Sequence, residues 1–484
     1  MAPNINFEDV FFDKMVEETL FYSPKIEMKP VHLANGLFRA VCGKFAKADT
    51  QHEAVYPKGY PDSNVDEQIR EVLNSILSAD STLFNKARMS SYTLSHVSHI
   101  TSDDHDRGTG EWLHAVLSHD DGDGPSPALA LLDELLNQDN RQRSDEISVL
   151  TLPLTKSDFE LKNFNAHLSS KHPSSLMVNE KGAFCDPLLY AIRTGFDHIA
   201  EYDKDTGRYS GKLDTLRRLV TWGCFSIYLH LSNSGFLKRD RRVPMMLCMT
   251  ETPRTALRET SNQSYHWVSR SIDKFLRTSI QSMIDKMAEE GTYGSWETDD
   301  DIEQLIENMA WKPTRGGMRQ AEERLGKYNL QCHLFYDSYR SDTANQPPRV
   351  AFANAAADMV DQIVSSRPSY FARNLGTRIG LLSSGTHARK HYMPTPDLLE
   401  VLVRSSVPPK EQWTIDKLAR YWADQYGLLF GALGDENDRL ASWGIRTVDG
   451  SNLYDNVDKL ATVLEMSGYA QRYADGVVVV SVRK

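Results

Sequence analysis

The sequence predicts a mainly α-helical protein with a small amount of β structure, divided into several domains. Apolar residues recur at helical spacing in segments along much of the chain, whereas strand-like runs are short and few. The composition is that of an ordinary globular protein, with 40% hydrophobic and 25% charged residues. The length of 484 residues suits about three domains of roughly 150 residues each.

The first 150 residues are expected to form an acidic α/β domain. Amphipathic helices are predicted over 6–20, 65–79 and 127–137, because the apolar side chains of each fall on one helical face. A β-branched run at 147–154 predicts a strand and marks the first boundary. This region holds 13 Lys and Arg against 25 Asp and Glu, while the rest of the chain holds 42 against 41. The acidic charge is therefore concentrated at the front of the chain.

A helical middle domain is expected over residues 151–345, followed by a basic helical connector over 346–395. The segment 212–231 is apolar almost all round, which is typical of a buried central helix. Helices are predicted in the middle domain at 186–201, 212–231, 256–290 and 302–311.

Residues 396–484 have the clearest pattern of elements. Three helices are predicted, at about Pro396–Ser405, Thr414–Gln425 and Asp455–Met466. Two strand-like runs then flank Asp475-Gly476, a hairpin signal because Gly tolerates the positive φ of such turns. This order of elements resembles the winged-helix superfamily, and the resemblance covers residues 396–484 only. It implies that the third helix would be the one to enter a DNA major groove.

The third helix of this winged-helix-like domain is acidic, with Asp455, Asp458 and Glu465 against Lys459. Phosphate contacts supply most of the affinity for DNA, and they require Lys or Arg. The sequence therefore favours a domain that packs against another protein or another part of the chain. Direct reading of DNA is the alternative.

A basic window lies between Asp361 and Asp397, because no acidic residue occurs in that interval. Arginines interleaved with aromatic residues suit phosphate contact and base stacking. The favoured interpretation of the window by itself is a surface helix that docks on the acidic N-terminal third, with nucleic-acid or phosphate contact and contact with an acidic protein as the alternatives. A smaller basic group follows the central helix, where a solvated loop is the ordinary interpretation. The candidate nucleic-acid residues are Arg367, Tyr370, Arg373, Arg378, Arg389 and Lys390 in the window, and Lys238, Arg239, Arg241 and Arg242 in the smaller group.

Five of the fifteen histidines lie within 96–121, mixed with aspartates. Such mixtures can bind Zn, Mn or Fe, but the spacing matches no metal motif and HExxH is absent. A flexible surface loop is the expectation here, with a metal site as the alternative. The metal-ligand candidates are His96, His99, Asp103, Asp104 and His105.

The sequence gives little indication of disulfide, zinc-ribbon or phosphate-loop chemistry. The five cysteines are widely spaced and lack CxxC, which argues against a disulfide framework or a zinc ribbon and favours reduced thiols. Residues 36–44 resemble a phosphate-cradling loop, but the spacing is too long and Phe45 stands where Ser or Thr would hold Mg²⁺. We expect no catalytic motif and no cofactor.

Taken together, these observations predict a non-enzymatic adaptor or structural subunit of a cytoplasmic multiprotein complex that acts on nucleic acid. A bacterial genome-defence (antiviral) or DNA-processing system is compatible with it. Other protein subunits are the expected partners, together with DNA or RNA. A membrane is not expected, because no apolar run reaches the ~18 residues of a span and the N-terminus lacks a secretory signal. The alternatives are a metal-dependent hydrolase or nuclease using the 96–121 stretch, and a DNA-binding regulator.

Overall fold

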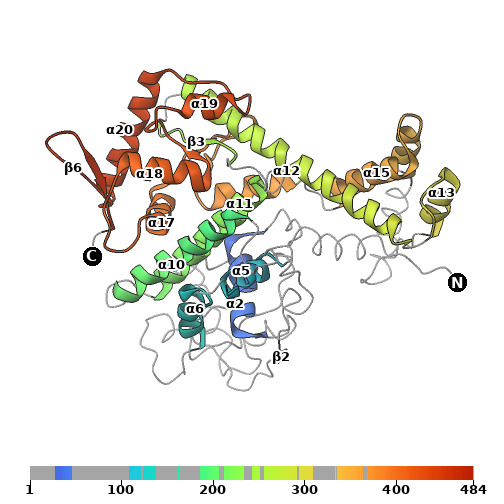
Figure 1. The fold of residues 1–484 in the computed structure, drawn as a ribbon, viewed down its shortest axis with the longest axis horizontal. Coiled ribbons are helices and arrows are strands. Elements are labelled where there is room, and N and C mark those ends of the chain that lie inside the picture. The colour runs from blue at the N-terminus through green and yellow to red at the C-terminus, as the bar shows by residue number, and fades with distance from the viewer. Residues whose placement is uncertain are drawn as a thin grey trace, which may run out of the picture. The chain divides into compact units, whose positions relative to one another are not determined.

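The structure is a computed structural model in which most residues of the described elements lie in helices (Figure 1), and the described strands are only two or three residues long. The predicted mainly α class is therefore confirmed. The chain divides into two compact units: unit 1 is Met1–Ile26 with Ser271–Phe371, and unit 2 is Glu27–Arg270 with Ala372–Lys484. The four domains expected from the sequence stay a prediction. The residues that the structure describes are 28–45, 108–120, 124–137, 162–163, 186–206, 212–233, 242–250, 255–291, 294–308, 333, 335–363 and 368–482.

Unit 1 is a helical cluster with its own apolar core. The second half of α12 (Ala256–Glu289), α13 (Asp299–Asn308), a helix over 335–343 and α15 (Pro348–Ile363) turn their apolar faces toward one another. The alanines of α15 allow close packing, and the Trp296 ring meets Phe352 edge-on at 5.2 Å. The core includes Ile280, Met283, Ile284, Met287, Trp296, Ile302, Phe335, Tyr339 and Phe352.

Unit 2 is organised around α10 (Pro187–Thr206) and α11 (Lys212–Asn233), which lie side by side in Figure 1. The prediction of a buried central helix is confirmed, since α11 is buried over most of its length. The two helices approach closely because Gly195 has no side chain: a Cβ there would lie 2.3 Å from the Trp222 ring. The Trp222 indole N–H donates to the Ile192 carbonyl at 2.9 Å, which satisfies the one polar atom of this buried ring.

The N-terminal part of unit 2 packs α2 (Pro30–Cys42), α5 (Thr109–Ser118) and α6 (Pro127–Asn137) together and against the central pair. The expectation of a flexible loop was wrong over 109–118, where α5 buries Trp112, Leu113, Val116 and Leu117. Gly110 lets α5 contact α2, because a Cβ at Gly110 would meet the backbone of Gly36 and Leu37 at under 2.7 Å. A short antiparallel pair joins β1 (Lys44–Phe45) to β2 (Lys162–Asn163).

The last part of unit 2 contains the three predicted helices and the hairpin in the predicted order, with the unpredicted β5 and α19 between the second and third of these helices. The Asp475-Gly476 turn is present, and Gly476 takes the positive φ of 83°. Three short strands form an antiparallel sheet in the order β4-β7-β6. The elements are α17 (Pro396–Ser406), β4 (Trp413–Thr414), α18 (Ile415–Tyr421), a π-helical turn (Trp422–Tyr426), β5 (Leu428–Leu429), α19 (Glu436–Ala441), α20 (Gly450–Met466), β6 (Ala470–Arg472) and β7 (Val478–Val480).

A parallel strand pair joins these C-terminal elements to the middle of the chain. β3 (Met245–Met246) pairs with β5, and Gly427, just before β5, has a φ of 75°. A Cβ on Gly427 would lie 2.2 Å from the Val243 carbonyl oxygen, so only glycine permits this approach. The buried side chain of Asn456 on α20 then donates to the Leu247 carbonyl at 3.0 Å. The C-terminal elements are therefore packed into unit 2.

Four charged side chains meet where α10, α11 and α17 converge. Asp203 is 1% exposed and lies 3.2 Å from Arg218 and 3.5 Å from Arg404. Glu400 lies 2.8 Å from the same Arg218 and 3.1 Å from Arg404. Two cations and two carboxylates thus neutralise one another, which buried charges require.

We expect Arg218→Met to lower the free energy of unfolding by about 3 kcal/mol, because it leaves the buried Asp203 with one cation instead of two. The matched control is Arg217→Met. Arg217 is 46% exposed and pairs with the exposed Asp214, so its loss should cost less than about 0.5 kcal/mol. Urea unfolding of both variants measures the difference, and equal losses would contradict a buried ion cluster.

Candidate nucleic-acid interface

The basic window contains α16 (Pro368–Arg378) and a loop over 383–392 that lies against the first half of α12. Asn262 on α12 donates to the carbonyl oxygens of Lys390 at 2.7 Å and Ala388 at 3.1 Å. The Tyr392 amide donates to the Ser261 hydroxyl at 3.0 Å. The loop is therefore held in place by side chains of α12 that are more than 120 residues away in sequence.

Positive side chains from three elements gather at this loop. Burial lowers the pKa of Lys390, and the nearby charge of Arg373 lowers it further. Burial also lowers the pKa of His391; its hydrogen bond to the Arg389 carbonyl opposes this effect, and the charges of Arg258 and Lys390 add to it. Like charges thus act on both groups. We call Arg258, Arg373, Arg389 and Lys390 the basic cluster.

The cations of the basic cluster differ in how far they reach solvent. Arg389 is exposed at the end of a single 3-10 turn, His387–Arg389. Arg258 and Arg373 are partly exposed, whereas Lys390 is buried and its Nζ donates to the Ser383 carbonyl at 2.6 Å. Arg389 is therefore the cation best placed to meet an external anion.

Aromatic and histidine side chains pack against the inner side of the loop over 383–392. The Tyr265 hydroxyl lies 3.0 Å from the His387 Nδ1, and the His266 and His387 rings stand 5.2 Å apart. Deeper still, the hydroxyls of Tyr228 and Tyr392 are hydrogen bonded at 3.0 Å. This buried framework fixes the backbone that carries Arg389.

The other predicted interface residues lie in different surroundings. Tyr370 is half-buried in the first turn of α16. Arg378 donates from Nη1 to the Met28 carbonyl oxygen, so α16 does contact the N-terminal third, here through a neutral carbonyl. Arg242 is buried and pairs with Asp186 at 3.2 Å. Arg367, Lys238, Arg239 and Arg241 lie outside the described residues.

Sequence reasoning missed Arg258 and the α12 residues that hold the loop. Arg258 stands beside Glu259 in a helix of mixed charge, so no local excess of positive charge marked it. Its place beside the loop depends on how α12 packs, which no spacing within the basic window could reveal.

The helix that would read DNA in a winged helix carries its own neutralising contacts. Arg472 on β6 pairs with Asp458 at 2.6 Å and with Glu465 at 3.2 Å, both on α20. Lys459 donates to the Thr250 hydroxyl at 3.1 Å. These cations are thus engaged within unit 2.

Metal and thiol chemistry find little support in the part of the chain that the structure describes. No group of three or more His, Cys, Asp or Glu there could hold a metal ion, and the candidates His96, His99, Asp103, Asp104 and His105 lie outside it. Burial raises the pKa of the Cys42 thiol to about 12, and the charge of Asp133 adds to this, so this thiol is unreactive near neutral pH.

Within the described segments, no helix combines the length and apolar character that a membrane crossing requires. Comparison with known proteins finds no family model that matches the chain and no curated protein that resembles it significantly.

The buried His391 makes the stability of unit 2 depend on pH. Its Nδ1 contacts the Arg389 carbonyl at 3.1 Å, while its Nε2 is buried without a hydrogen-bond partner among the described residues. Protonation would add a buried charge beside Arg258 and Lys390, so the folded-state pKa lies below the ordinary 6.5. The stability that His391 contributes is therefore complete above about pH 6.5 and is lost as the pH falls through the folded pKa.

We expect His391→Asn, which keeps an N–H near the Nδ1 position, to weaken this pH dependence. The free energy of unfolding of the native protein should fall between pH 7.5 and pH 5.5, and that of the variant should fall less. Urea titrations at both pH values measure the two slopes. Equal slopes would contradict a neutral, buried His391.

Proposed function

We propose that this chain is a non-enzymatic adaptor or structural subunit of a complex that acts on nucleic acid. In this proposal the basic cluster contacts the phosphate backbone. The observation that carries it is geometric: side chains of α12 hold the loop that carries the exposed Arg389 and the buried Lys390, and Arg258 of α12 and Arg373 of α16 lie near that loop. Burial lowers the pKa of Lys390, and the positive charge of Arg373 lowers it further. A polyanion placed there would relieve this repulsion, because each phosphate supplies the opposite charge.

The local composition supports the same assignment. No carboxylate occurs in the sequence from 362 to 396, so neither α16 nor the loop brings a negative charge of its own to the cluster. Contacts of this kind are independent of base sequence and weaken steeply with salt. The proposed contact therefore positions the chain on nucleic acid and does not select a sequence.

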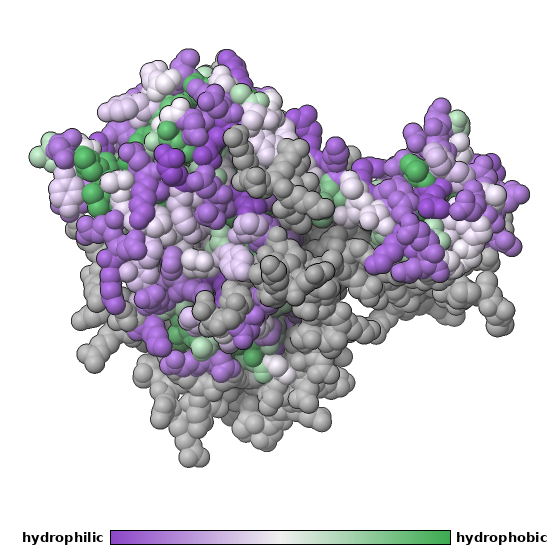
Figure 2. Space-filling model, in the orientation of Figure 1, coloured by the Kyte–Doolittle hydropathy of each residue, from purple (hydrophilic) through white to green (hydrophobic). Residues whose placement is uncertain are grey.

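The C-terminal elements are proposed to be a winged-helix domain that binds protein. The strand order β4-β7-β6 supports the winged-helix part of this proposal, as does the order α17, β4, α18, α20, β6, β7, into which the π-helical turn, β5 and α19 are inserted between α18 and α20. On α20, the side chains of Tyr454 and Met466 are 75% and 84% exposed. Tyr473 and Val477 of the hairpin are also exposed, and Figure 2 shows hydrophobic side chains among hydrophilic ones on this side of the molecule.

Exposed aromatic and Met side chains beside an acidic helix suit a protein partner better than DNA. Aromatic residues and Met are enriched at protein interfaces, whereas the carboxylates of α20 would repel phosphates. Location in the cytoplasm and a role in genome defence or DNA processing belong to this proposal as predictions from the sequence.

We expect Arg389→Glu to weaken binding to DNA or RNA by about tenfold at ~50 mM salt, because it removes one phosphate contact and adds a repulsion. The loss should be similar for different base sequences, and combination with Arg373→Glu should deepen it. Fluorescence anisotropy with labelled 30-nucleotide strands and duplexes measures the affinities.

The matched control is Arg420→Glu, which reverses an exposed charge on α18 outside the basic cluster. It should leave the affinity within about twofold. Absence of any affinity in the native protein, or an equal loss in the control, would refute contact through the basic cluster.

A further inference from the structure

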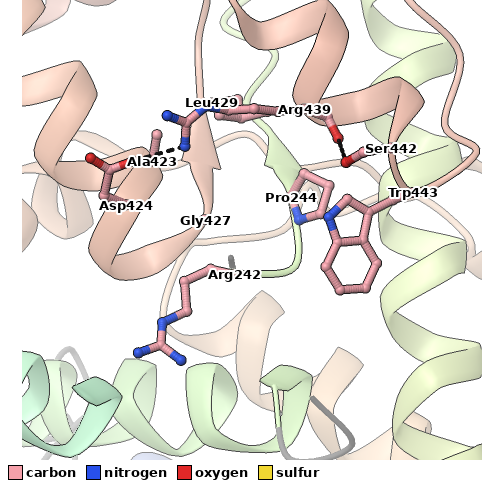
Figure 3. A pocket seen from close by; sticks show the side chains of 9 residues that line it. All are labelled: Arg242, Pro244, Ala423, Asp424, Gly427, Leu429, Arg439, Ser442 and Trp443. Atoms are coloured by element: carbon pink, nitrogen blue, oxygen red, sulfur yellow. Dashed lines mark hydrogen bonds and ion pairs between the residues drawn. The ribbon is translucent and has the colours of Figure 1, made fainter. Parts of the chain in front are cut away.

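A cavity of about 390 Å³ opens beside the β3–β5 strand pair (Figure 3). It is bounded by the residues just before β3, by the π-helical turn and by α19 with the turn that follows it. All of these lie in unit 2. The volume is within the range of small-molecule sites. The lining residues on which the argument depends are Pro244, Asp424, Leu429, Arg439, Ser442 and Trp443.

One side of the cavity presents an ion pair. The Arg439 Nη1 donates to the Asp424 carboxylate at 2.8 Å, and its Nε donates to Asp435 at 3.0 Å. Arg439 is 23% exposed and Asp424 47%, so both still face solvent at this site. The pair therefore offers a ligand the guanidinium donors of Arg439 next to the carboxylate acceptor of Asp424.

The other side presents an aromatic ring and apolar atoms. The Trp443 ring is fixed edge-on against Trp267, with ring centres 4.7 Å apart. Pro244 and Leu429 extend the apolar lining. In Figure 3, Trp443 and Pro244 lie on the side of the cavity away from Asp424. A flat ligand between the two sides could stack on the indole and hydrogen bond to the ion pair at its edge.

Arg242, the other cation that lines the cavity, does not alter this arrangement of an ion pair on one side and apolar atoms on the other. The side chain of Arg242 runs away from Arg439 and Asp424 in Figure 3. Its guanidinium pairs with Asp186 at 3.2 Å, and both side chains are more than nine-tenths buried. Arg242 therefore lines the cavity without presenting an open positive charge to it.

Local backbone geometry maintains the cavity. Asp424 lies on the π-helical turn Trp422–Tyr426, a rare conformation that recurs at functional sites. The turn ends at Gly427, whose positive φ and missing Cβ allow the chain at Val243 to pass close by. An ordinary α-helical turn at this point would direct Asp424 differently, because each residue of a π turn advances the helix by a smaller angle.

We infer that this cavity binds a nucleobase, and guanine in particular. The guanine edge carries two N–H groups beside the O6 acceptor, which complements a carboxylate beside a guanidinium. Proteins that bind single bases combine such edge contacts with stacking on an aromatic ring. The base comes either from a free nucleoside or nucleotide, or from a nucleic-acid strand. The inference does not depend on the basic cluster.

The test titrates the full-length protein with guanosine, adenosine, cytidine and uridine while tryptophan fluorescence is followed. Guanosine should quench the fluorescence, and Trp443→Phe should remove most of the quenching. The other three nucleosides should bind at least about tenfold more weakly. Failure of guanosine to bind, or equal binding of all four nucleosides, overturns the inference.

Two variants at exposed cavity residues test the contacts by calorimetry. Asp424→Asn should lower the affinity for guanosine by about tenfold, because the amide keeps one acceptor oxygen and sets an NH2 donor where the carboxylate accepts the second N–H. Ser442→Phe should abolish binding, because the ring would occupy the cavity. Asp416→Asn, an exposed carboxyl on α18 away from the cavity, is the control and should change nothing. Unchanged affinity in both cavity variants would also overturn the inference.

The source of the base is separated by two oligonucleotides, a thymidine 12-mer and the same 12-mer with one central guanine. A preference for the guanine strand that Asp424→Asn removes assigns the base to a strand. Binding of guanosine without such a preference assigns it to a free nucleoside or nucleotide. Arg389→Glu should weaken both strands and leave guanosine unchanged, so failure of the proposed phosphate contact is distinguishable from failure of this site.

Discussion

The buried cluster of Arg218, Arg404, Asp203 and Glu400 is the constraint on which the C-terminal half of unit 2 depends. Burial raises the pKa of Glu400, but the charges of the two arginines outweigh it, so the pKa of this carboxyl lies below its ordinary value. Glu400 therefore stays ionised in the fold, and the four charges can balance only if α10, α11 and α17 keep their relative positions. Arg404 also lies over the rings of Tyr202 and Tyr469, and Tyr469 directly precedes β6, so the base of the hairpin is linked to the same cluster.

This constraint explains how two-residue strands can position the lining of the cavity. The β3–β5 pair is too short to be stable by itself. Because α17 is fixed on the central helices, the chain that follows α18 lies next to the segment at Val243. The two backbones can then approach each other, since Gly427 has no side chain. The cavity at Asp424 and Trp443 lies beside that meeting point, so its shape depends on contacts between segments about 180 residues apart in sequence.

Periodicity and turn chemistry predicted the elements whose stability is local. The helix at 127–137, the buried helix α11 and the turn at Asp475-Gly476 were all readable from residue spacing. The helix α5 was not, because glycines and histidines surround its four apolar positions and suggested a loop. The absence of carboxylates from the basic window indicated Arg373 and Arg389. The position of Arg258 and the cavity depend on tertiary packing. Neither a two-residue strand nor a single arginine leaves a sequence pattern from which that packing could be predicted.

Two surfaces of unit 2, at α20 and at the loop over 383–392, differ in the contacts that a bound polyanion would have to displace. At α20, a phosphate would compete with two carboxylates for Arg472 and would approach Asp455 as well. At the loop over 383–392, Arg389 is already exposed, and the charges that lower the pKa of its neighbours Lys390 and His391, besides burial, are positive. Phosphate binding therefore gains Coulomb energy at the loop and loses it at α20. The proposed function therefore assigns the exposed Tyr454 and Met466 to contact with another protein and the loop over 383–392 to contact with nucleic acid.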